Sequence, residues 1–189
     1  MKNELNNSFS TQENSILSIS FENCYSSDYK IEEGIIKILN LLLKKNRNLQ
    51  NYHKILRLQE NNIFNSKEIP KISLIDYLER IKKYSEIENN TLIISLIYID
   101  RLLQNSNLIL TPFNIHRILF TSILISLKYN EDLIFEFSYY SQIAGISINE
   151  LKIYESEFLK IIDFILYIDK NEFDKYKHLL LNSIENLYN

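Results

Sequence analysis

The chain holds very few of the residues that interrupt helices. It has only two glycines and two prolines in 189 residues. Folds built from many short strands need a tight turn every few residues, and glycine and proline are the residues those turns most often require. Their scarcity favours long helices over β structure with many turns. We therefore expect an all-α protein.

The composition is that of one globular domain. Hydrophobic residues make up 46% of the chain and charged residues 24%, and this length is enough to bury a sizeable core. The formal net charge is −3, so no overall positive field would attract nucleic acid or anionic lipid. No apolar run reaches the roughly 18 residues that span a bilayer, and no signal-like segment opens the sequence. We expect an intracellular protein of the cytoplasm or nucleus, with no membrane or nucleic-acid partner.

The sequence predicts three parts. Residues 1–30 are rich in serine and asparagine and weakly apolar, so we expect a flexible leader. Residues 31–62 would form an N-terminal helix, centred on residues 35–45, and the start of a polar, asparagine-broken loop that runs over residues 46–67. Residues 63–189 would form the single organised domain, closed by a C-terminal helix.

Start and stop signals divide the domain into helices. Ser73 with Asp76 three residues later predicts one helix start, and Thr111–Pro112 predicts another. Gly145 predicts a helix end, and Ser147–Glu150 reads as a capping box. Apolar residues at helical spacing complete the pattern. The predicted helices lie at residues 73–84, 90–103, 111–129, 137–144, 147–162 and 172–187.

The third of these helices has almost no polar side. Such a helix is typically surrounded by others, so residues 111–129 predict the hub of the core. It nevertheless ends on Lys128 and Tyr129, followed by an asparagine and two acids. A charged end on a buried helix indicates that the last turn emerges at the surface.

Common catalytic and metal-binding patterns are missing. No H-E-x-x-H, E-x-x-H or C-x-x-C occurs, and Gly34 and Gly145 cannot build a phosphate-binding glycine loop. Cys24 lies in the predicted leader with no histidine near it in sequence. We expect no catalytic residue, no metal and no cofactor. The histidines are remote from one another in sequence: His53, His116 and His178.

Several spaced segments resemble the cyclin box. They include YIDRLL at residues 98–103, TPFNIHRILFTSILISLKYNED, and ISINELKIYESEFLKIIDFIL. Together with IPKISLIDYLERI and SYYSQIAGIS they look like the P/U-type, or phosphate-pathway, cyclins, over residues 63–177. The resemblance implies a single five-helix cyclin box with additional N- and C-terminal helices. It also implies a non-catalytic regulatory subunit that forms a heterodimer with a cyclin-dependent serine/threonine protein kinase, and activates it by positioning the kinase regulatory helix.

The resemblance also assigns a kinase-binding surface. In cyclins a lysine at the end of the central helix and a glutamate in the fifth helix grip the kinase, and Lys128 and Glu155 match them. Tyr129, Leu159 and Phe164 match the apolar contacts around that pair. Charge-assisted hydrogen bonds from such a pair contribute about 1.5 to 3 kcal/mol each when water is excluded.

A structural ion pair is implied as well. Asp100 matches the cyclin aspartate that pairs with a basic residue at the start of the first helix, and Lys71 holds that position. The pair would pin the first helix of the box to the second. The docking patch of cell-cycle cyclins is not reproduced, because Pro70 and Ser73 replace apolar residues and Tyr77 replaces a tryptophan.

Other interpretations stand beside this one. Without the resemblance, Lys128 is a basic residue suited to a helix C-terminus and Glu155 is an exposed acid. A cyclin-fold protein can also act as a scaffold without activating a kinase, or as a transcription-factor-like module that touches DNA. A kinase assay separates the first alternative from an activator. A steep salt dependence of DNA binding would indicate the second.

Overall fold

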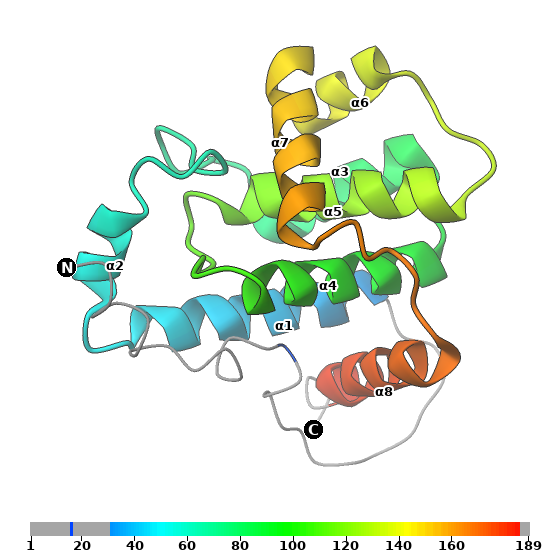
Figure 1. Cartoon of the computed structure of the whole chain (residues 1–189). Helices are drawn as coiled ribbons and strands as arrows, with labels where there is room; N and C mark the ends of the chain where they lie inside the picture. The colour runs from blue at the N-terminus through cyan, green and yellow to red at the C-terminus, as the bar shows by residue number, and fades with distance from the viewer. Residues whose placement is uncertain (1–15, 17–30, 186–189) are drawn as a thin grey trace.

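The computed structural model describes residue 16 and residues 31–185, and every regular element of the latter stretch is a helix. The all-α prediction is confirmed. The predicted flexible leader, residues 1–30, lies outside the described residues except at Ile16, which is fully buried in the core. The helices (Figure 1) are α1 (Ile31–Arg47), α2 (Tyr52–Leu58), α3 (Leu74–Ser85), α4 (Asn89–Gln104), α5 (Ile115–Asn130), α6 (Phe137–Ala144), α7 (Ile148–Ile161) and α8 (Lys170–Glu185).

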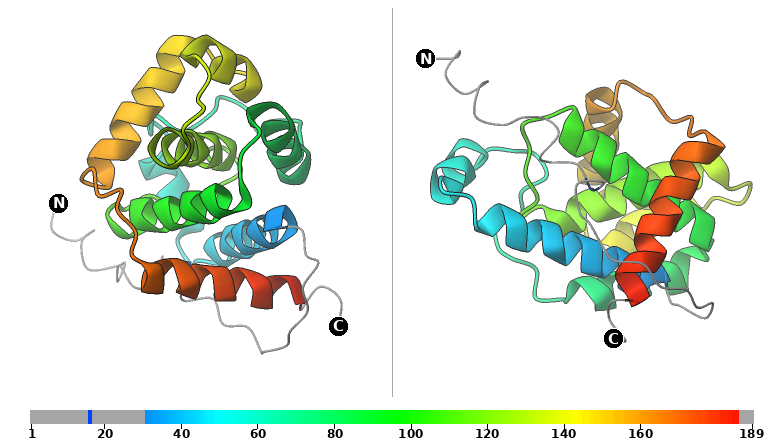
Figure 2. Two further views of the ribbon diagram at one scale, coloured as in Figure 1. Left: turned by 90° about the vertical axis from the view of Figure 1, so that its right-hand side faces the viewer. Right: turned by 90° about the horizontal axis from the view of Figure 1, so that it is seen from below.

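The apolar helix α5 lies at the centre of the molecule, as its sequence predicts. Its residues from Ile118 to Leu127 are all buried, and the helix packs against α3, α4, α6 and α7. The left view of Figure 2 looks nearly along α5 and shows these four helices around it. The helices α3 to α7 therefore form the five-helix unit that the sequence predicts, with α5 as its hub.

The flanking helices form a second layer. Helices α1 and α8 pack on each other and on α4, on the side of α4 away from α7 (Figure 2). The Lys37 ammonium donates to the carbonyl oxygen of Ser183 at 2.6 Å, and Lys82 of α3 pairs with Glu32 of α1. The N- and C-terminal helices are thus joined to each other and to the five-helix unit.

The predicted helix boundaries mostly hold because their capping side chains form the expected bonds. Ser73 accepts the N–H of Asp76, and Ser147 forms a full capping box with Glu150 at the start of α7. Gly145 ends α6 with φ +72°, a left-handed conformation that glycine adopts without strain.

The predicted start of α5 is wrong by about one turn. Thr111 and Pro112 do not open the helix; α5 begins at Ile115. The side chain of Asn114 explains the difference, because its Oδ1 accepts the N–H of Thr111 at 2.8 Å and its Nδ2 donates to the carbonyl oxygen of Ile109 at 3.0 Å. These bonds close a turn ahead of the helix.

The predicted loop at residues 46–67 contains a short helix, α2. The sequence of this helix is mostly polar, and its one buried residue is Ile55. In Figure 1 this helix and the segment after it stand at one edge of the molecule, beside the connection between α4 and α5.

Candidate functional site

The structure brings the two predicted charged residues together. Lys128 lies in the last turn of α5 and Glu155 near the middle of α7, and the lysine Nζ lies 2.6 Å from the glutamate Oε1. Both side chains reach solvent, with exposed fractions of 34% and 15%. The pair is therefore at the surface, where a partner can reach it.

An aromatic ring holds the lysine from another side. The Nζ of Lys128 lies 4.7 Å from the ring centroid of Phe137, the first residue of α6, and Lys152 of α7 lies 6.0 Å from the same ring. Such cation–π contacts favour a fixed position of the ammonium group. Phe137 could not be predicted from the sequence, because the loop before α6 does not indicate that the chain returns to place this ring over Lys128.

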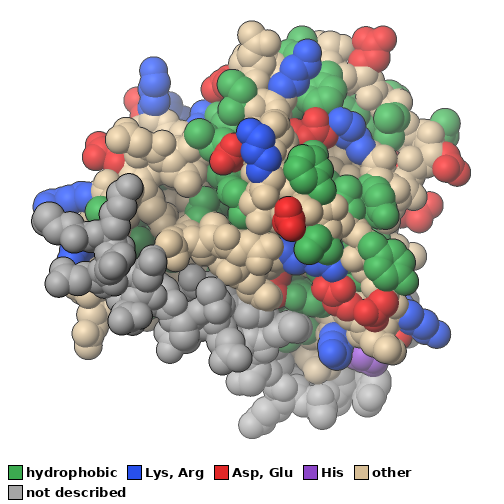
Figure 3. Space-filling model, in the orientation of Figure 1, with side chains coloured by type: hydrophobic (Ala, Val, Ile, Leu, Met, Phe, Trp, Pro, Cys, Tyr) green, Lys and Arg blue, Asp and Glu red, His purple; other side chains and the backbone are tan. Residues whose placement is uncertain are grey.

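The predicted apolar residues differ in their exposure. Tyr129 and Phe164 are exposed over 52% and 63% of their surface, whereas Leu159 is half-buried against the core. Figure 3 shows hydrophobic side chains among acidic and basic ones on this face, over α5, α7 and the segment that follows α7. Exposed aromatic side chains beside a charge pair are typical of an interaction surface.

The segment after α7 turns sharply to present its side chains. Asp163 and Phe164 adopt left-handed φ angles of 54° and 55°, and the N–H of Phe164 donates to the carbonyl oxygen of Leu159 at 2.9 Å. A left-handed conformation costs a residue other than glycine about 1 to 2 kcal/mol. The surrounding contacts must offset that cost, and they leave Phe164, Ile165 and Tyr167 exposed.

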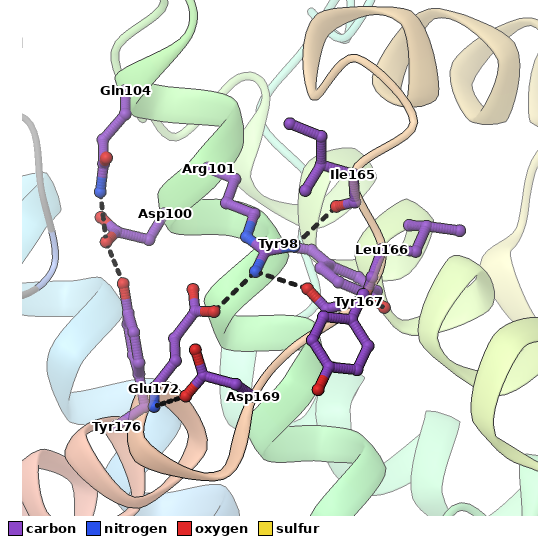
Figure 4. Close-up of polar contacts among 10 residues, drawn as sticks. All are labelled: Tyr98, Asp100, Arg101, Gln104, Ile165, Leu166, Tyr167, Asp169, Glu172 and Tyr176. Carbon is purple, nitrogen blue, oxygen red and sulfur yellow. Dashed lines mark hydrogen bonds and ion pairs between the residues drawn. The ribbon is translucent and has the colours of Figure 1, made fainter.

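Arg101 of α4 supplies most of those contacts (Figure 4). Its Nη1 donates to the carbonyl oxygen of Ile165 at 2.6 Å, and its Nη2 donates to that of Tyr167 at 3.0 Å and pairs with Glu172 at 2.8 Å. The hydroxyl of Tyr98 donates to the carbonyl oxygen of Leu166 at 2.9 Å, and burial raises the pKa of that phenol to about 12. We call Arg101 and Tyr98 the backbone clamp, because they hold the main chain of this segment.

The predicted ion pair between Lys71 and Asp100 is not formed in the part of the chain that the structure describes. Asp100 is fully buried and accepts a hydrogen bond from the N–H of Ile16. It also accepts from the Tyr176 hydroxyl and from Gln104 Nε2, the latter at 2.7 Å (Figure 4). Lys71 is exposed in the bend before α3. Bringing an ammonium into the core would cost its hydration, whereas a phenol and an amide enter more easily. Asp100 therefore joins α4 to α8 rather than to α3.

The described residues contain no group of three or more histidine, cysteine, aspartate or glutamate side chains that could hold a metal ion. Within the same residues, no helix combines the length and apolar character needed to cross a membrane. His116 contacts the carbonyl oxygen of Ile72 at 3.1 Å and the ring of Tyr77, as a packed helix residue does. Cys24 lies outside the described residues.

Comparison with known proteins gives a consistent result. The family model described as Cyclin matches residues 9–166. The chain is 29% identical over 157 residues to Cyclin-U2-1 of Arabidopsis thaliana, covering 80% of this chain and 70% of that protein. It is 33% identical over 138 residues to Cyclin-P3-1 of Oryza sativa subsp. japonica, covering 73% and 58%.

A yeast relative extends the set. The chain is 34% identical over 129 residues to PHO85 cyclin-7 of Saccharomyces cerevisiae, covering 62% of this chain and 45% of that protein. The matches thus span from about half to about two thirds of the relatives' own length. The matched region includes all five helices of the central unit and the Lys128–Glu155 pair. From the fold, the family model and these relatives together, the chain belongs to the cyclin family and is a cyclin of the P/U type.

Proposed function

We propose that this chain is the regulatory subunit of a cyclin-dependent protein kinase and binds it through the Lys128 surface, which comprises Lys128, Tyr129, Glu155, Leu159 and Phe164. The observation that carries the proposal is the 2.6 Å ion pair between Lys128 and Glu155, exposed on a face with uncovered aromatic side chains. Membership of the cyclin family supports the same function. The chain contributes no catalytic group and acts on the kinase by contact.

Both members of the pair keep capacity for a partner. The Lys128 ammonium carries three hydrogens and gives one to Glu155 Oε1, while Oε2 of Glu155 has no hydrogen-bond partner among the described residues. The pair can thus donate to a carbonyl oxygen and accept an N–H from the ends of another protein's helix. Tyr129 and Phe164 would cover these bonds and exclude water from them.

Fixing the kinase regulatory helix would account for activation. That helix carries the glutamate that pairs with the kinase's own ATP-positioning lysine, and phosphoryl transfer requires this pair to be in place. A cyclin that bonds to the helix shifts the kinase toward the state in which the pair is formed. Two or three charge-assisted bonds at about 1.5 to 3 kcal/mol each are of the size that such a shift needs.

Exchanging the two charges tests the surface. In the double variant Lys128→Glu/Glu155→Lys the intramolecular pair can re-form, so we expect the melting temperature to stay within a few degrees of the wild type. The order of donor and acceptor offered to a partner is reversed, so we expect at least a tenfold loss of the kinase that co-purifies from native cells. Binding is measured by affinity purification with mass spectrometry, and folding by circular dichroism.

A second ion pair on α7 provides the matched control. Glu157 and Lys160 lie 3.6 Å apart on the same helix and are more exposed, so the exchange Glu157→Lys/Lys160→Glu alters charges without touching the Lys128 surface. We expect this variant to retain the kinase. Equal retention by both folded variants would refute the assignment of the surface.

Activation is tested on the purified complex. We expect the kinase to phosphorylate a peptide substrate much faster with the chain than without it, and the chain alone to transfer no phosphate. A stable complex with no rise in rate would instead identify a scaffold.

A further inference from the structure

A hollow lies between the junction of α3 with α4 and the loop that joins α5 to α6. It encloses about 690 Å³, within the range of about 300 to 1,000 Å³ typical of binding pockets. The loop stands at the right-hand edge of Figure 1. Asn130, which follows Tyr129 in the chain, lines the hollow. The hollow therefore adjoins the Lys128 surface.

Four carboxylates line this hollow, and no basic residue does. They are Glu86 and Glu88 of the α3–α4 junction and Glu131 and Asp132 of the α5–α6 loop. None of them forms an ion pair within the described part of the chain, and no group of acids there could hold a metal ion. A hollow lined by one sign of charge concentrates the field for the opposite sign. Separate cationic groups, such as lysine and arginine side chains, are the ligands that fit.

An exposed hydrophobic run completes the lining. Leu133 is 89% exposed, and the next two residues, Ile134 and Phe135, are exposed as well. Consecutive large apolar side chains in contact with water are unfavourable, and in natural proteins they commonly mark interaction sites. The hollow thus offers apolar contacts beside its charges, which a simple cation would leave uncovered.

The loop that carries this run is fixed by hydrogen bonds and ring contacts. The Oε1 of Glu131 accepts the N–H of Glu88 at 3.1 Å and so joins the two walls of the hollow. The N–H of Phe135 donates to the Tyr140 hydroxyl at 3.2 Å, and the Phe135 ring centroid lies 4.6 Å from that of Tyr139. The hydrophobic run is therefore held in place before any partner arrives, which lowers the entropy cost of binding.

We propose that this hollow docks an extended segment of a substrate protein in which arginine or lysine alternates with leucine or another large apolar residue. Successive side chains of an extended chain point to opposite sides. The basic side chains would face Glu86 and Glu88, and the apolar ones would cover the run at residues 133–135. The assignment to a substrate rests on the proposed function, because a segment held here would lie beside the kinase bound to the Lys128 surface.

Docking is tested on the full chain without a kinase. The probe is a fluorescein-labelled peptide of alternating arginine and leucine, and the comparison peptides alternate arginine with serine and glutamate with leucine. By fluorescence anisotropy we expect saturable binding of the arginine–leucine peptide, weakened by salt. Each comparison peptide should bind at least tenfold more weakly, because each lacks one of the two features. Equal binding of the arginine–serine peptide would indicate general attraction to an acidic protein and overturn the proposal, as would no binding of the probe.

The charge arm uses the double variant Glu86→Gln/Asp132→Asn, which removes two charges with little change in shape. We expect it to bind the arginine–leucine peptide at least fivefold more weakly. The control Glu60→Gln/Glu68→Gln removes two exposed charges from the segment after α2, at the opposite edge of the molecule (Figure 1), and should bind as the wild type does. Equal affinity of the two double variants would contradict the site.

The apolar arm uses Leu133→Ser, with Leu58→Ser on α2 as its control. Both leucines are exposed, so both variants should melt as the wild type does. Only Leu133→Ser should weaken binding of the arginine–leucine peptide. An unchanged affinity in Leu133→Ser would exclude the hydrophobic run from the site.

The kinase complex tests whether the docked segment belongs to a substrate. A phosphorylatable peptide extended by the arginine–leucine segment should show a KM at least fivefold below that of the same peptide extended by arginine and serine, with kcat unchanged. The variant Glu86→Gln/Asp132→Asn should retain the kinase but abolish this difference. Equal KM values would exclude a substrate, and loss of the kinase from the variant would identify the kinase itself as the occupant; either result overturns the proposal. A chain that binds the peptide but no kinase would refute the proposed function, and with it the substrate, but not the docking.

Discussion

At the scale of single residues, Asp100 shows how a buried charge selects its partners. The carboxylate receives a main-chain N–H, a phenol and an amide, all of which enter the core at lower cost than an ammonium. Burial and the neighbouring carboxylate raise the pKa of the Tyr176 hydroxyl well above its ordinary value, so that hydroxyl stays protonated and donates. Asp100 thereby helps fix α8 to α4, beside the ion pair between Arg101 and Glu172.

We predict that Asp100→Ala lowers the free energy of unfolding by about 3 kcal/mol, because it leaves several buried donors unpaired. Urea unfolding monitored by circular dichroism measures the change. Asp174→Ala on α8, an acid that is only partly buried, serves as the control and should change stability by less than about 0.5 kcal/mol. A loss below about 1 kcal/mol in Asp100→Ala would mean that the network contributes little.

At the scale of elements, the segment between α7 and α8 gets its shape from another helix. Its own sequence contains no glycine, although two of its residues adopt left-handed angles. The backbone clamp of Arg101 and Tyr98 holds three of its carbonyl oxygens and so determines where Phe164 and Tyr167 stand. The candidate site therefore rests on α4 as well as on α5 and α7.

Removing the clamp should release the segment without unfolding the protein. We predict that Arg101→Met lowers the free energy of unfolding by about 2 kcal/mol, since it deletes hydrogen bonds from a charged group. It should also raise the amide hydrogen exchange of residues 162–168 and weaken kinase co-purification. Arg80→Met is the control, because Arg80 bonds to the single carbonyl oxygen of Gln142 elsewhere. Unchanged exchange in Arg101→Met would show that the segment holds its shape by itself.

The capping box at the start of α7 makes the stability of the protein depend on pH. Hydrogen bonds from Ser147 lower the pKa of Glu150, with a smaller contribution from Arg117, so the unfolded chain binds this proton more readily than the folded protein. The stabilisation is complete at neutral pH and is lost as the pH falls through the lowered pKa. We predict that Glu150→Gln is about 0.5 kcal/mol less stable than the wild type at pH 7 and equally stable in strong acid. Urea unfolding of both proteins between pH 7 and strong acid tests this prediction. A stability difference that does not change with pH would exclude the ionised carboxylate as its cause.

Across the whole molecule, the features that can be predicted from the sequence are those that depend on residues close together in the chain. The hub helix, the caps at Ser73 and Ser147 and the glycine at the end of α6 each depend on nearby residues, and all three are confirmed. The start of α5 could not be read correctly, because Asn114 closes its turn on Ile109 and Thr111 rather than continuing a helix. Residues joined over long separations were also missed, such as Phe137 over Lys128 and Arg101 on Ile165. Nothing in their spacing indicates where the chain returns.

The position of the Lys128 side chain has a consequence for recognition. Its ammonium is held by Glu155 and by the Phe137 ring before any partner arrives. A long lysine side chain ordinarily loses about 2 kcal/mol of rotamer freedom when it is immobilised on contact, and here most of that loss accompanies folding. A partner would then meet a side chain that is already in place, so less rotamer freedom would be lost on contact and the complex would be tighter than one formed by a freely rotating lysine.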